Sequence, residues 1–534
     1  MMIHDFLVES AQRRPEAPLL VHKGTRTSYG EIEASSNRCA RLLRDLGLRR
    51  GERVGLLLPN SARYVVSYYA GLKAGAVVVP MHQATDARSL RKLMGDCGAV
   101  GLIGGPGTRE RIMKATEELP DLRWVLLPAD ELTPGDPLPA HVRGVPESAE
   151  DAMSAEADPR RRGIDLDRAT IIYTSGSTGR PRGATLSHLN VVANTRSILA
   201  YLQLTSEDRV LQVLPFPYVY GKSLLNTHVA VGGSVVLHDN MVFPETALEA
   251  MERVQATSFA GVPATFAILL NRSSLARRRI PSLRYVTQAG GGMPLPHLKR
   301  LIEALPGVRI FVMYGATEAA ARLSWLEPEM LLSKLGSIGK PIPNVELTIR
   351  RDDGTEAEAG ETGEIVARGS NIMEGYWGDA EATAEVLDQH GFHTGDLGWR
   401  DEEGYLWVAG RKREMIKSGA HRISPKEIEE VLLEHPAVEE AAVVGKPDEY
   451  LGEIIVAHIT VRLEPAEVRS GPAEVLSESQ EVRGEPVTPN AIRLFCQERL
   501  PAHKVPQEVR IRDSMPRNPS GKLDKRALRE ETAG

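Results

Sequence analysis

The sequence predicts an α/β fold, with a large N-terminal domain built of two α/β layered units and a small β-barrel, followed by a small α+β C-terminal domain. Three observations predict this arrangement. Apolar runs of strand length alternate with helix-sized segments through the first three quarters of the 534 residues. From about Gly336 short strands and turns replace that alternation, and after about residue 410 a compact second alternation begins.

The first alternation starts near the N-terminus, where residues 1–18 have the spacing of an amphipathic helix. "RVGLLLP" (53–59) and "AVVVP" (76–80) predict buried strands on either side of the helical segment "SARYVVSYYAGLKAG". Later strands are predicted at "ATIIY", "RVLQVLP", "GSVVLHD", "LRYVTQ" and "RIFVMYG", with helices between them. Strands that alternate with helices form largely parallel sheets.

The remaining elements belong to the later part of the chain. "VELTIRRDDGTEAEAGETGEIVARG" predicts a small β-barrel-like unit. "SPKEIEEVLLEHP" predicts a helix with Ser424 as its N-cap and Pro425 at its first position, and "EEAAVVG" and "IIVAHITV" predict strands. Two polar stretches, 128–164 and 463–488, predict solvated loops or partly disordered insertions.

The composition is that of a globular protein, with 42% hydrophobic and 25% charged residues. The net charge of −6 provides no basic field, so we expect no nucleic-acid partner. Cys39, Cys97 and Cys496 are far apart in sequence, which predicts buried reduced thiols in a cytoplasmic protein. No apolar run reaches the roughly 18 residues that span a bilayer, so we expect no membrane span.

The loop "YTSGSTGRPRGA" (173–184) follows a predicted strand and combines glycines, hydroxyl side chains and arginines. Such a loop has little to bury, but its backbone N–H groups and hydroxyls can surround an anion such as phosphate. It is not a P-loop, because Pro181 lies where the motif requires the first turn of a helix. A surface turn is the alternative.

Further polar segments follow other predicted strands. In "MYGATEAA" (313–320), Tyr314 offers a flat face to a base, Thr317 a hydroxyl and Glu318 a carboxylate able to hold Mg²⁺. "QAGGGMP" (288–294) is opened by glycines, and "HTGDLG" (393–398) offers Asp396 to the hydroxyls of a ribose. "GRKREMIKSGAHRISP" and "PRNPSGKLDKR" add basic residues. Each segment alone is equally well explained by a tight turn or a solvated charge.

Taken in order, these segments resemble the adenylate-forming superfamily of acyl-CoA synthetases, aryl-CoA ligases, luciferases and peptide-synthetase adenylation domains. The resemblance rests on "YTSGSTGRPRG", "MYGATE", "GSIGKPIPN", "GEIVARGSNIMEGYW", "HTGDLG", "GRKREMIKSGAHRISPKEIEE" and "NPSGKLDK". It implies an AMP- and acyl-binding domain over 1–410, a hinge at 411–413 that includes Arg413, and a lid domain over 414–534. It also implies ATP, Mg²⁺ and coenzyme A as cofactors and a small-molecule carboxylic acid as substrate.

The resemblance further implies roles for individual residues. Lys522, Glu318 and Thr317 would be catalytic, with Lys522 bridging the substrate carboxylate and the α-phosphate and with Glu318 and Thr178 as metal ligands. ATP or AMP would be bound by Thr174, Ser175, Gly176, Ser177, Thr178, Gly179, Arg182, Gly290, Gly291, Gly292, Tyr314, Gly315, Asp396 and Arg411. After acyl-AMP forms, the small domain would rotate and present a thiolation loop that contains Ser418, Gly419 and Ala420.

Three positions depart from the superfamily pattern: Arg182 replaces the usual lysine, Tyr218 a frequent histidine, and Arg413 a common aspartate or lysine at the hinge. None of them removes a step of the chemistry. We expect an acyl pocket that contains Tyr218, Gly221, Gly261, Gln288 and Ala289.

The segment 216–222 contains no aspartate, which favours an acid without an α-amino group. Small residues in the expected pocket favour a bulky hydrophobic, aryl or polycyclic acid. The sequence ends shortly after Lys522, so CoA is the simplest acceptor. The alternative acceptor is a discrete acyl carrier protein. The alternative functions are an acyl-AMP ligase without CoA activity and a non-catalytic sensor.

Overall fold

The computed structural model describes residues 1–132, 138–156, 163–174, 181–419, 421–462, 487–517 and 523–533. The chain forms two compact units. The first contains Met1–Met293, Arg300–Thr394 and Trp399–Trp407, and the second contains Pro294–Lys299, Gly395–Gly398 and Val408–Gly534. The predicted α/β fold with a large N-terminal and a small C-terminal domain is confirmed.

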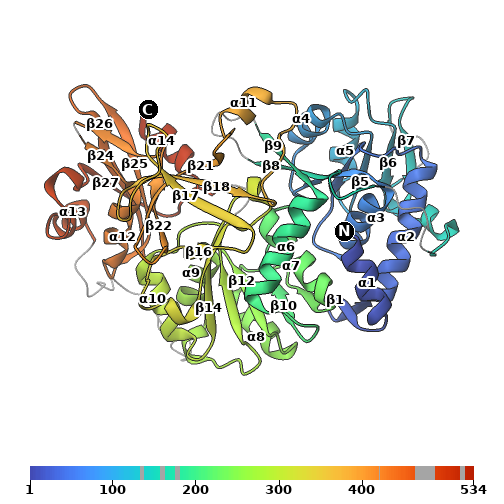
Figure 1. Ribbon diagram of the computed structural model, residues 1–534, viewed down its shortest axis with the longest axis horizontal. Helices are drawn as coiled ribbons and strands as arrows, with labels where there is room; N and C mark the ends of the chain where they lie inside the picture. Colours follow the sequence, from blue (N-terminus) through green and yellow to red (C-terminus); the bar gives the residue numbers. More distant parts are fainter. Residues whose placement is uncertain are drawn as a thin grey trace, which may run out of the picture. The chain divides into compact units, whose positions relative to one another are not determined.

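An eight-stranded sheet of the first unit has the order β19-β9-β8-β4-β3-β5-β6-β7. Figure 1 labels β9, β8, β5, β6 and β7 of this sheet. Its strands run parallel from β8 to β7, and β9 and β19 are antiparallel at one edge. The strands are β3 (Arg53–Leu57), β4 (Val77–Met81), β5 (Gly101–Gly104), β6 (Trp124–Leu127), β7 (Arg143–Pro146), β8 (Arg168–Thr174), β9 (Arg182–Ser187) and β19 (Gly375–Tyr376).

Helices cover both faces of this sheet because successive strand residues point to opposite faces. Val78 of β4 packs with α2 (Tyr29–Asp45) and α3 (Ala62–Ala74), whereas Val77 and Val79 pack with α4 (Ala87–Cys97) and α5 (Arg109–Thr116). Helix α3 begins where the Ser61 hydroxyl accepts a hydrogen bond from the backbone N–H of Tyr64. It ends at Gly75, whose φ of 85° suits a residue without a side chain.

A nine-stranded sheet completes the α/β part of the first unit, in the order β16-β15-β14-β13-β12-β10-β11-β1-β2. The strands from β14 to β1 are parallel, and β15, β16 and β2 are antiparallel at the edges. The strands are β1 (Pro18–His22), β2 (Thr25–Ser28), β10 (Arg209–Gln212), β11 (Ser234–Leu237), β12 (Ser258–Gly261), β13 (Tyr285–Gln288), β14 (Arg309–Tyr314), β15 (Ser324–Leu326) and β16 (Lys340–Pro341). The helices along this part are α1 (Asp5–Arg13), α6 (His188–Leu202), α7 (Val219–Val231), α8 (Pro244–Arg253), α9 (Pro263–Arg272) and α10 (Leu295–Ala304).

A smaller five-stranded sheet stands where the sequence predicts a β-barrel-like unit. Its order is β17-β18-β21-β20, with β22 paired to β21. The strands are β17 (Val345–Arg350), β18 (Gly363–Gly369), β20 (Leu387–Asp388), β21 (Gly391–Arg400) and β22 (Leu406–Arg411), and the short helix α11 (Ala380–Ala384) precedes β20.

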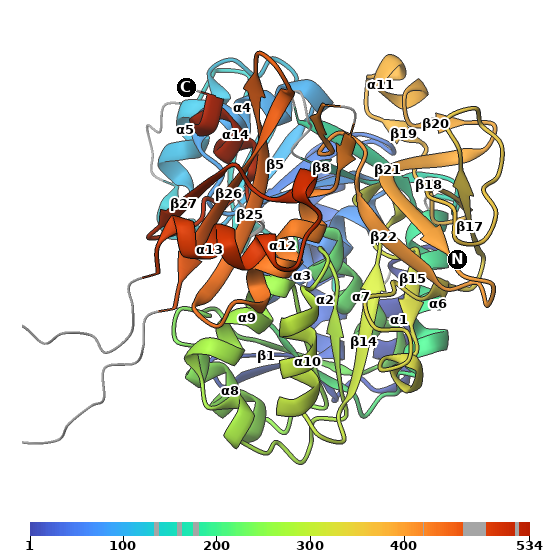
Figure 2. The ribbon, with the colours of Figure 1, turned by 90° about the vertical axis from the view of Figure 1, so that its left-hand side faces the viewer.

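The second unit is an α+β sandwich on a sheet of order β24-β23-β26-β25, with β27 beside β26 (Figure 2). Helices α12 (Pro425–Glu434) and α13 (Pro489–Gln497) pack on one face, and α14 (Lys525–Ala533) packs on the other. The strands are β23 (Ile416–Ser418), β24 (His421–Ile423), β25 (Val438–Asp448), β26 (Gly452–Val461) and β27 (Glu508–Arg512). Helix α12 begins at Pro425 as predicted, although the Ser424 hydroxyl donates to the backbone oxygen of Ala409 rather than capping the helix.

The prediction of a solvated or partly disordered loop over 128–164 is wrong in part. This stretch contains strand β7 and the 3₁₀ turn Glu147–Ala152. Glu150 is buried there and accepts two hydrogen bonds from the Arg63 guanidinium, so a partner on α3 holds this acidic segment against the core. Most of the second polar stretch, 463–486, lies outside the described residues.

Two other expectations can be compared with the described part of the chain. All three cysteines are buried and unpaired, as expected. Among the described helices, none combines the length and the apolar character that crossing a bilayer requires.

Candidate functional site

The predicted phosphate loop connects β8 and β9, which pair as an antiparallel hairpin. Thr174 ends β8 and faces Arg182, which begins β9, and the Thr174 hydroxyl lies 3.4 Å from the backbone oxygen of Arg182. The hairpin therefore fixes both ends of the loop at one edge of the sheet. The predicted residues between them lie outside the described residues: Ser175, Gly176, Ser177, Thr178 and Gly179.

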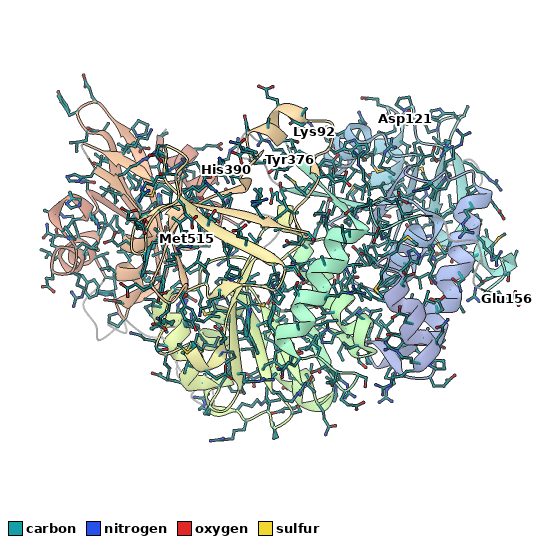
Figure 3. The ribbon with its side chains drawn as sticks, in the orientation of Figure 1. Lys92, Asp121, Glu156, Tyr376, His390 and Met515 are labelled. Atoms are coloured by element: carbon teal, nitrogen blue, oxygen red, sulfur yellow. The ribbon has the colours of Figure 1, made fainter. Side chains whose placement is uncertain are left out.

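Tyr376 connects Arg182 with Glu318, a role that the sequence analysis did not assign. The Arg182 guanidinium lies 5.4 Å from the centre of the Tyr376 ring, and the Tyr376 hydroxyl donates a hydrogen bond of 2.8 Å to Oε1 of Glu318 (Figure 3, where Tyr376 is labelled). Arg182 also forms an ion pair of 3.1 Å with Glu385. The sequence signal for Tyr376 is its place in "NIMEGYW", a segment that carries the family resemblance.

Backbone contacts hold this group in place. Strand β19 pairs with β9, which sets Tyr376 opposite Ala184, and the backbone N–H of Met373 donates to the backbone oxygen of Glu318. Burial raises the pKa of Tyr376, and the Glu318 carboxylate raises it further. The phenol therefore stays protonated near neutral pH and remains a hydrogen-bond donor to Glu318.

The segments 288–294 and 313–320 lie at the same edge of the nine-stranded sheet. Strands β13 and β14 are parallel, with Gln288 opposite Val312. Gly290, Gly291 and Gly292 therefore follow the carboxyl end of β13, while Tyr314 ends β14 and Gly315 follows it. Ligands of open α/β sheets bind at this edge. Thr317 and Glu318 continue from it in a short 3₁₀ turn.

Two glycines here have a clear physical requirement. Gly290 has a φ of 86°, in the left-handed region that favours glycine. A Cβ on Gly315 would lie 2.0 Å from the backbone oxygen of Ala321, so only glycine fits there.

The residues of the expected acyl pocket come from the ends of β12 and β13 and from the start of α7. Gly261 at the end of β12 faces Gln288 of β13, whose side-chain amide donates to the backbone oxygen of Gly291. Tyr218 precedes α7 and its ring stacks with His82 at 6.1 Å. Ala289 is buried directly after Gln288.

The inference that small residues leave room in this pocket is wrong for two of them. A Cβ on Gly221 would lie 2.3 Å from the backbone oxygen of Pro215, and one on Gly261 would lie 2.9 Å from the Phe266 ring. Other protein atoms already fill these spaces. Both glycines therefore permit close packing and do not enlarge a cavity.

The second unit brings Asp396 and Arg411 together. Asp396 lies on β21 and Arg411 ends β22, and the Arg411 Nε lies 2.7 Å from Oδ1 of Asp396. Asp396 is only 5% exposed, so the pair is a buried carboxylate held by a charged donor.

The predicted hinge and thiolation loop also lie in this unit. The backbone oxygen of Arg413 accepts from the Arg529 side chain at 3.5 Å. Ser418 is buried. Gly419 has a φ of 59°, and among the described residues that are not its chain neighbours only a Leu451 methyl lies within 4 Å of the position of its missing Cβ. Ala420 and Lys522 lie outside the described residues.

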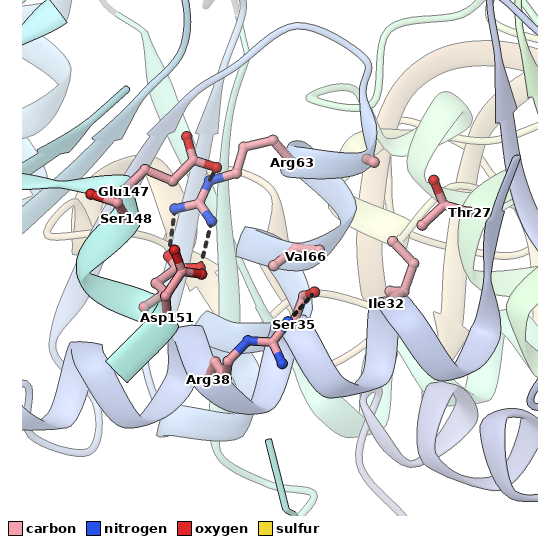
Figure 4. Close-up of a pocket in the computed structure, with 11 residues that line it drawn as sticks. Thr27, Ile32, Ser35, Arg38, Arg63, Val66, Glu147, Ser148 and Asp151 are labelled. Atoms are coloured by element: carbon pink, nitrogen blue, oxygen red, sulfur yellow. Dashed lines mark hydrogen bonds and ion pairs between the residues drawn. The ribbon is translucent and has the colours of Figure 1, made fainter. Parts of the chain in front are cut away.

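A surface pocket of about 380 Å³ lies elsewhere in the first unit, between α2, α3 and the turn Glu147–Ala152 (Figure 4). Arg63 lies in its wall and pairs with Glu147 and Glu150. None of the predicted site residues lines it. The candidate site therefore rests on the strand ends and not on this pocket.

Comparison with known families gives two matches. The profile of the AMP-binding enzyme family matches residues 7–377, and the profile of the AMP-binding enzyme C-terminal domain matches residues 427–522. The first match alone covers more than half of the chain.

Individual proteins agree with these matches. Feruloyl-CoA synthase of an Amycolatopsis species is 32% identical over 523 residues, which cover 98% of this chain and 97% of the relative. The structure of an anthranilate CoA ligase in complex with anthranoyl-AMP has a TM-score of 0.86 and 25% sequence identity. The match covers 100% of this chain and 97% of the ligase chain. The o-succinylbenzoate coenzyme A synthetase of Bacillus subtilis, in complex with ATP and magnesium ion, has a TM-score of 0.80 at 29% identity and covers 99% and 98%.

Proposed function

This chain belongs to the AMP-binding enzyme family, and we propose that it is an AMP-forming acid:CoA ligase, which activates a carboxylic acid with ATP and transfers the acyl group to coenzyme A. The observation that carries the proposal is the Arg182–Tyr376–Glu318 group, within the range of the family match. In this proposal Tyr376 supports Arg182, which would contact the phosphates, and Glu318, which would hold Mg²⁺.

The chemistry of the first step explains why such a group is useful. A carboxylate that attacks a phosphate is an anion approaching an anion, so fixed positive charge lowers the barrier. We assign Arg182 and Lys522 to that charge and Glu318 to Mg²⁺, whose preference for carboxylate oxygen fits this residue. Bound Mg²⁺ would neutralise phosphate charge, while Tyr376 keeps the Glu318 carboxylate oriented.

The nucleoside would be held by the two strand-end segments and by the Asp396–Arg411 pair. In this proposal Tyr314 stacks on adenine beside the Gly290–Gly292 backbone, and Asp396 accepts hydrogen bonds from the ribose hydroxyls. Arg411, bound to Asp396 through Nε, orients that carboxylate. Thr317 contacts the α-phosphate.

For the second step we propose a rotation of the C-terminal domain about Arg413 that withdraws Lys522 and presents residues 418–420. The open space at Gly419 supports this assignment, because a thiol arm needs room beside the backbone. A cytoplasmic location, where ATP and CoA are available, completes the proposal.

We propose a bulky hydrophobic or aryl acid as the substrate. The relatives support this, since their names specify feruloyl, anthranoyl and o-succinylbenzoate groups. The alternatives for the acceptor are a discrete acyl carrier protein, or no thiol at all in an acyl-AMP ligase.

A hydroxamate screen of diverse carboxylic acids with ATP and Mg²⁺ tests the first step, and thioester formation with free CoA tests the acceptor. Lys522→Ala should lower adenylate formation by about 10²–10³-fold, the effect of removing one electrostatic stabiliser, and should spare thioester formation from supplied acyl-AMP. An equal loss in both half-reactions would contradict the two-state scheme.

A further inference from the structure

Arg322 is a buried cation whose charge is not paired with a carboxylate among the described residues. It is 2% exposed and lies just after the predicted segment "MYGATEAA". Its guanidinium lies 4.2 Å from the centre of the Tyr220 ring. Within the described chain it donates hydrogen bonds of 3.1 Å to the backbone oxygen of Ala321 and of 3.3 Å to the Met313 sulfur, and it also interacts with the Tyr201 hydroxyl. These partners are all neutral, so none of them balances the charge of the guanidinium.

Two other buried basic residues of the same unit have carboxylate partners, and a third, Lys222, can lose its charge because burial lowers its pKa to about 7, which an arginine cannot do. Arg63 is paired with Glu147 and Glu150. Lys73 donates hydrogen bonds to Glu33, Ser36 and Asn37. Removing a charge from water without a partner is costly, and proteins normally compensate for it in this way. The fold thus retains an uncompensated arginine at position 322.

The neighbours of Arg322 place it at the ligand-binding edge of the sheet. Met313 is near the carboxyl end of β14. The Tyr220 hydroxyl donates to the backbone oxygen of Thr287, which precedes Gln288 at the end of β13. The guanidinium therefore lies beside two adjacent strand ends and next to the residues assigned to the acyl pocket.

The backbone that carries Arg322 is held in an unusual conformation. Ala320 has a φ of 52° and Ala321 a φ of 127°, values that favour glycine. The side-chain amides of Asn194 and Asn371 both donate to the backbone oxygen of Arg322. Strain of this kind persists where the surrounding structure fixes it, and it is concentrated at binding sites.

We propose that Arg322 binds a second acidic group of the substrate, so that the preferred substrates are acids with an additional carboxylate remote from the one that is activated. The inference rests on the proposed function and deepens it, because it assigns a substrate class to the same site. A second carboxylate would accept two hydrogen bonds from the planar guanidinium and neutralise the buried charge. Tyr220 would support the guanidinium from its face.

The test uses matched pairs of acids that differ only in the second carboxylate: hexanoic and adipic, decanoic and sebacic, cinnamic and 4-carboxycinnamic acid. We expect wild-type kcat/KM for adenylation to be about 10–100-fold higher for the dicarboxylic member of at least one pair, the range for hydrogen bonds to charged groups. Arg322→Met should abolish that preference chiefly through the KM of the dicarboxylic acid. Arg322→Lys should retain part of it.

Lys222→Met is the matched control, because Lys222 is a buried basic residue of α7, the helix that carries Tyr220, but its amino group faces the Tyr64 and Tyr68 rings. In each pair of acids, the Lys222→Met variant should prefer the dicarboxylic member to the same degree as the wild type. The inference is overturned, and the proposed function stands, if wild type favours the monocarboxylic acid in every pair. The same holds if Arg322→Met lowers kcat/KM by the same factor for both members of each pair. If no acid of either kind forms a hydroxamate, the proposed function fails and the inference fails with it.

Discussion

Tyr376→Phe removes one hydroxyl from the candidate site and leaves the aromatic ring in place. The deleted hydroxyl donates a hydrogen bond of 2.8 Å to Oε1 of Glu318. The ring, whose centre lies 5.4 Å from the Arg182 guanidinium, remains. The substitution therefore separates the support of Glu318 from the support of Arg182. Because the pKa of Tyr376 is raised by burial and by Glu318, the wild-type hydroxyl donates throughout the neutral range.

The size of the effect follows from the type of bond. A hydrogen bond to a charged acceptor contributes about 1.5–3 kcal/mol. The bond is only partly buried, so the lower end applies, and about 1.4 kcal/mol corresponds to a tenfold change in rate or affinity. We expect adenylation to require about tenfold more Mg²⁺, because a Glu318 carboxylate without its donor is less well oriented for the ion.

The measurement is pyrophosphate exchange as a function of Mg²⁺ concentration at saturating ATP and acid. Tyr69→Phe is a suitable control, because it also deletes a buried hydroxyl, one that donates to Asn226 within the core. It should lower the melting temperature without changing the Mg²⁺ dependence. Identical Mg²⁺ curves for Tyr376→Phe and wild type would refute the proposed role of Tyr376.

Three further predictions concern single positions. Gly315→Ala should unfold or strongly destabilise the first unit, since its Cβ would meet the backbone oxygen of Ala321 at 2.0 Å, and a thermal scan with a normal melting temperature would contradict this. Burial lowers the pKa of Lys222 to about 7, and its amino group has no hydrogen-bond partner among the described residues. Between about pH 7 and the ordinary lysine pKa, Lys222 is therefore protonated in the unfolded chain but not in the folded one, so the free energy of unfolding should rise with pH across that window. Lys222→Met should raise the free energy of unfolding at pH 7 and flatten its rise with pH. Lys73→Met should lower the free energy of unfolding, because it leaves the Glu33 carboxylate unpaired. Urea titrations of both variants at pH 7 and pH 9 measure these effects. Gly419→Ala should destabilise the left-handed turn at φ 59° by about 1 kcal/mol and slow thioester formation more than adenylation; equal slowing of both steps, measured separately, would argue against the thiolation role.

The order of strands, helices and polar segments could be predicted from the sequence because it depends on local periodicity and turn chemistry. Buried runs such as 76–80 and 168–174 became parallel strands, and the segments that follow β13 and β14 lie at one sheet edge as expected. The acidic stretch 143–152 was predicted less well, because its strand and turn depend on Arg63, a partner far away in the chain.

The sequence by itself determined the family, the α/β layering and the identity of the polar segments, because each is a local pattern or a motif in fixed order. Only the tertiary structure decided that Tyr376 lies between Arg182 and Glu318 and that Gly221 and Gly261 are packed rather than open. It also decided that Arg322 is buried with no carboxylate partner among the residues that the structure describes. These features join residues that are distant in the chain. Their contacts depend on how side chains fill the space between two elements, which no local pattern records.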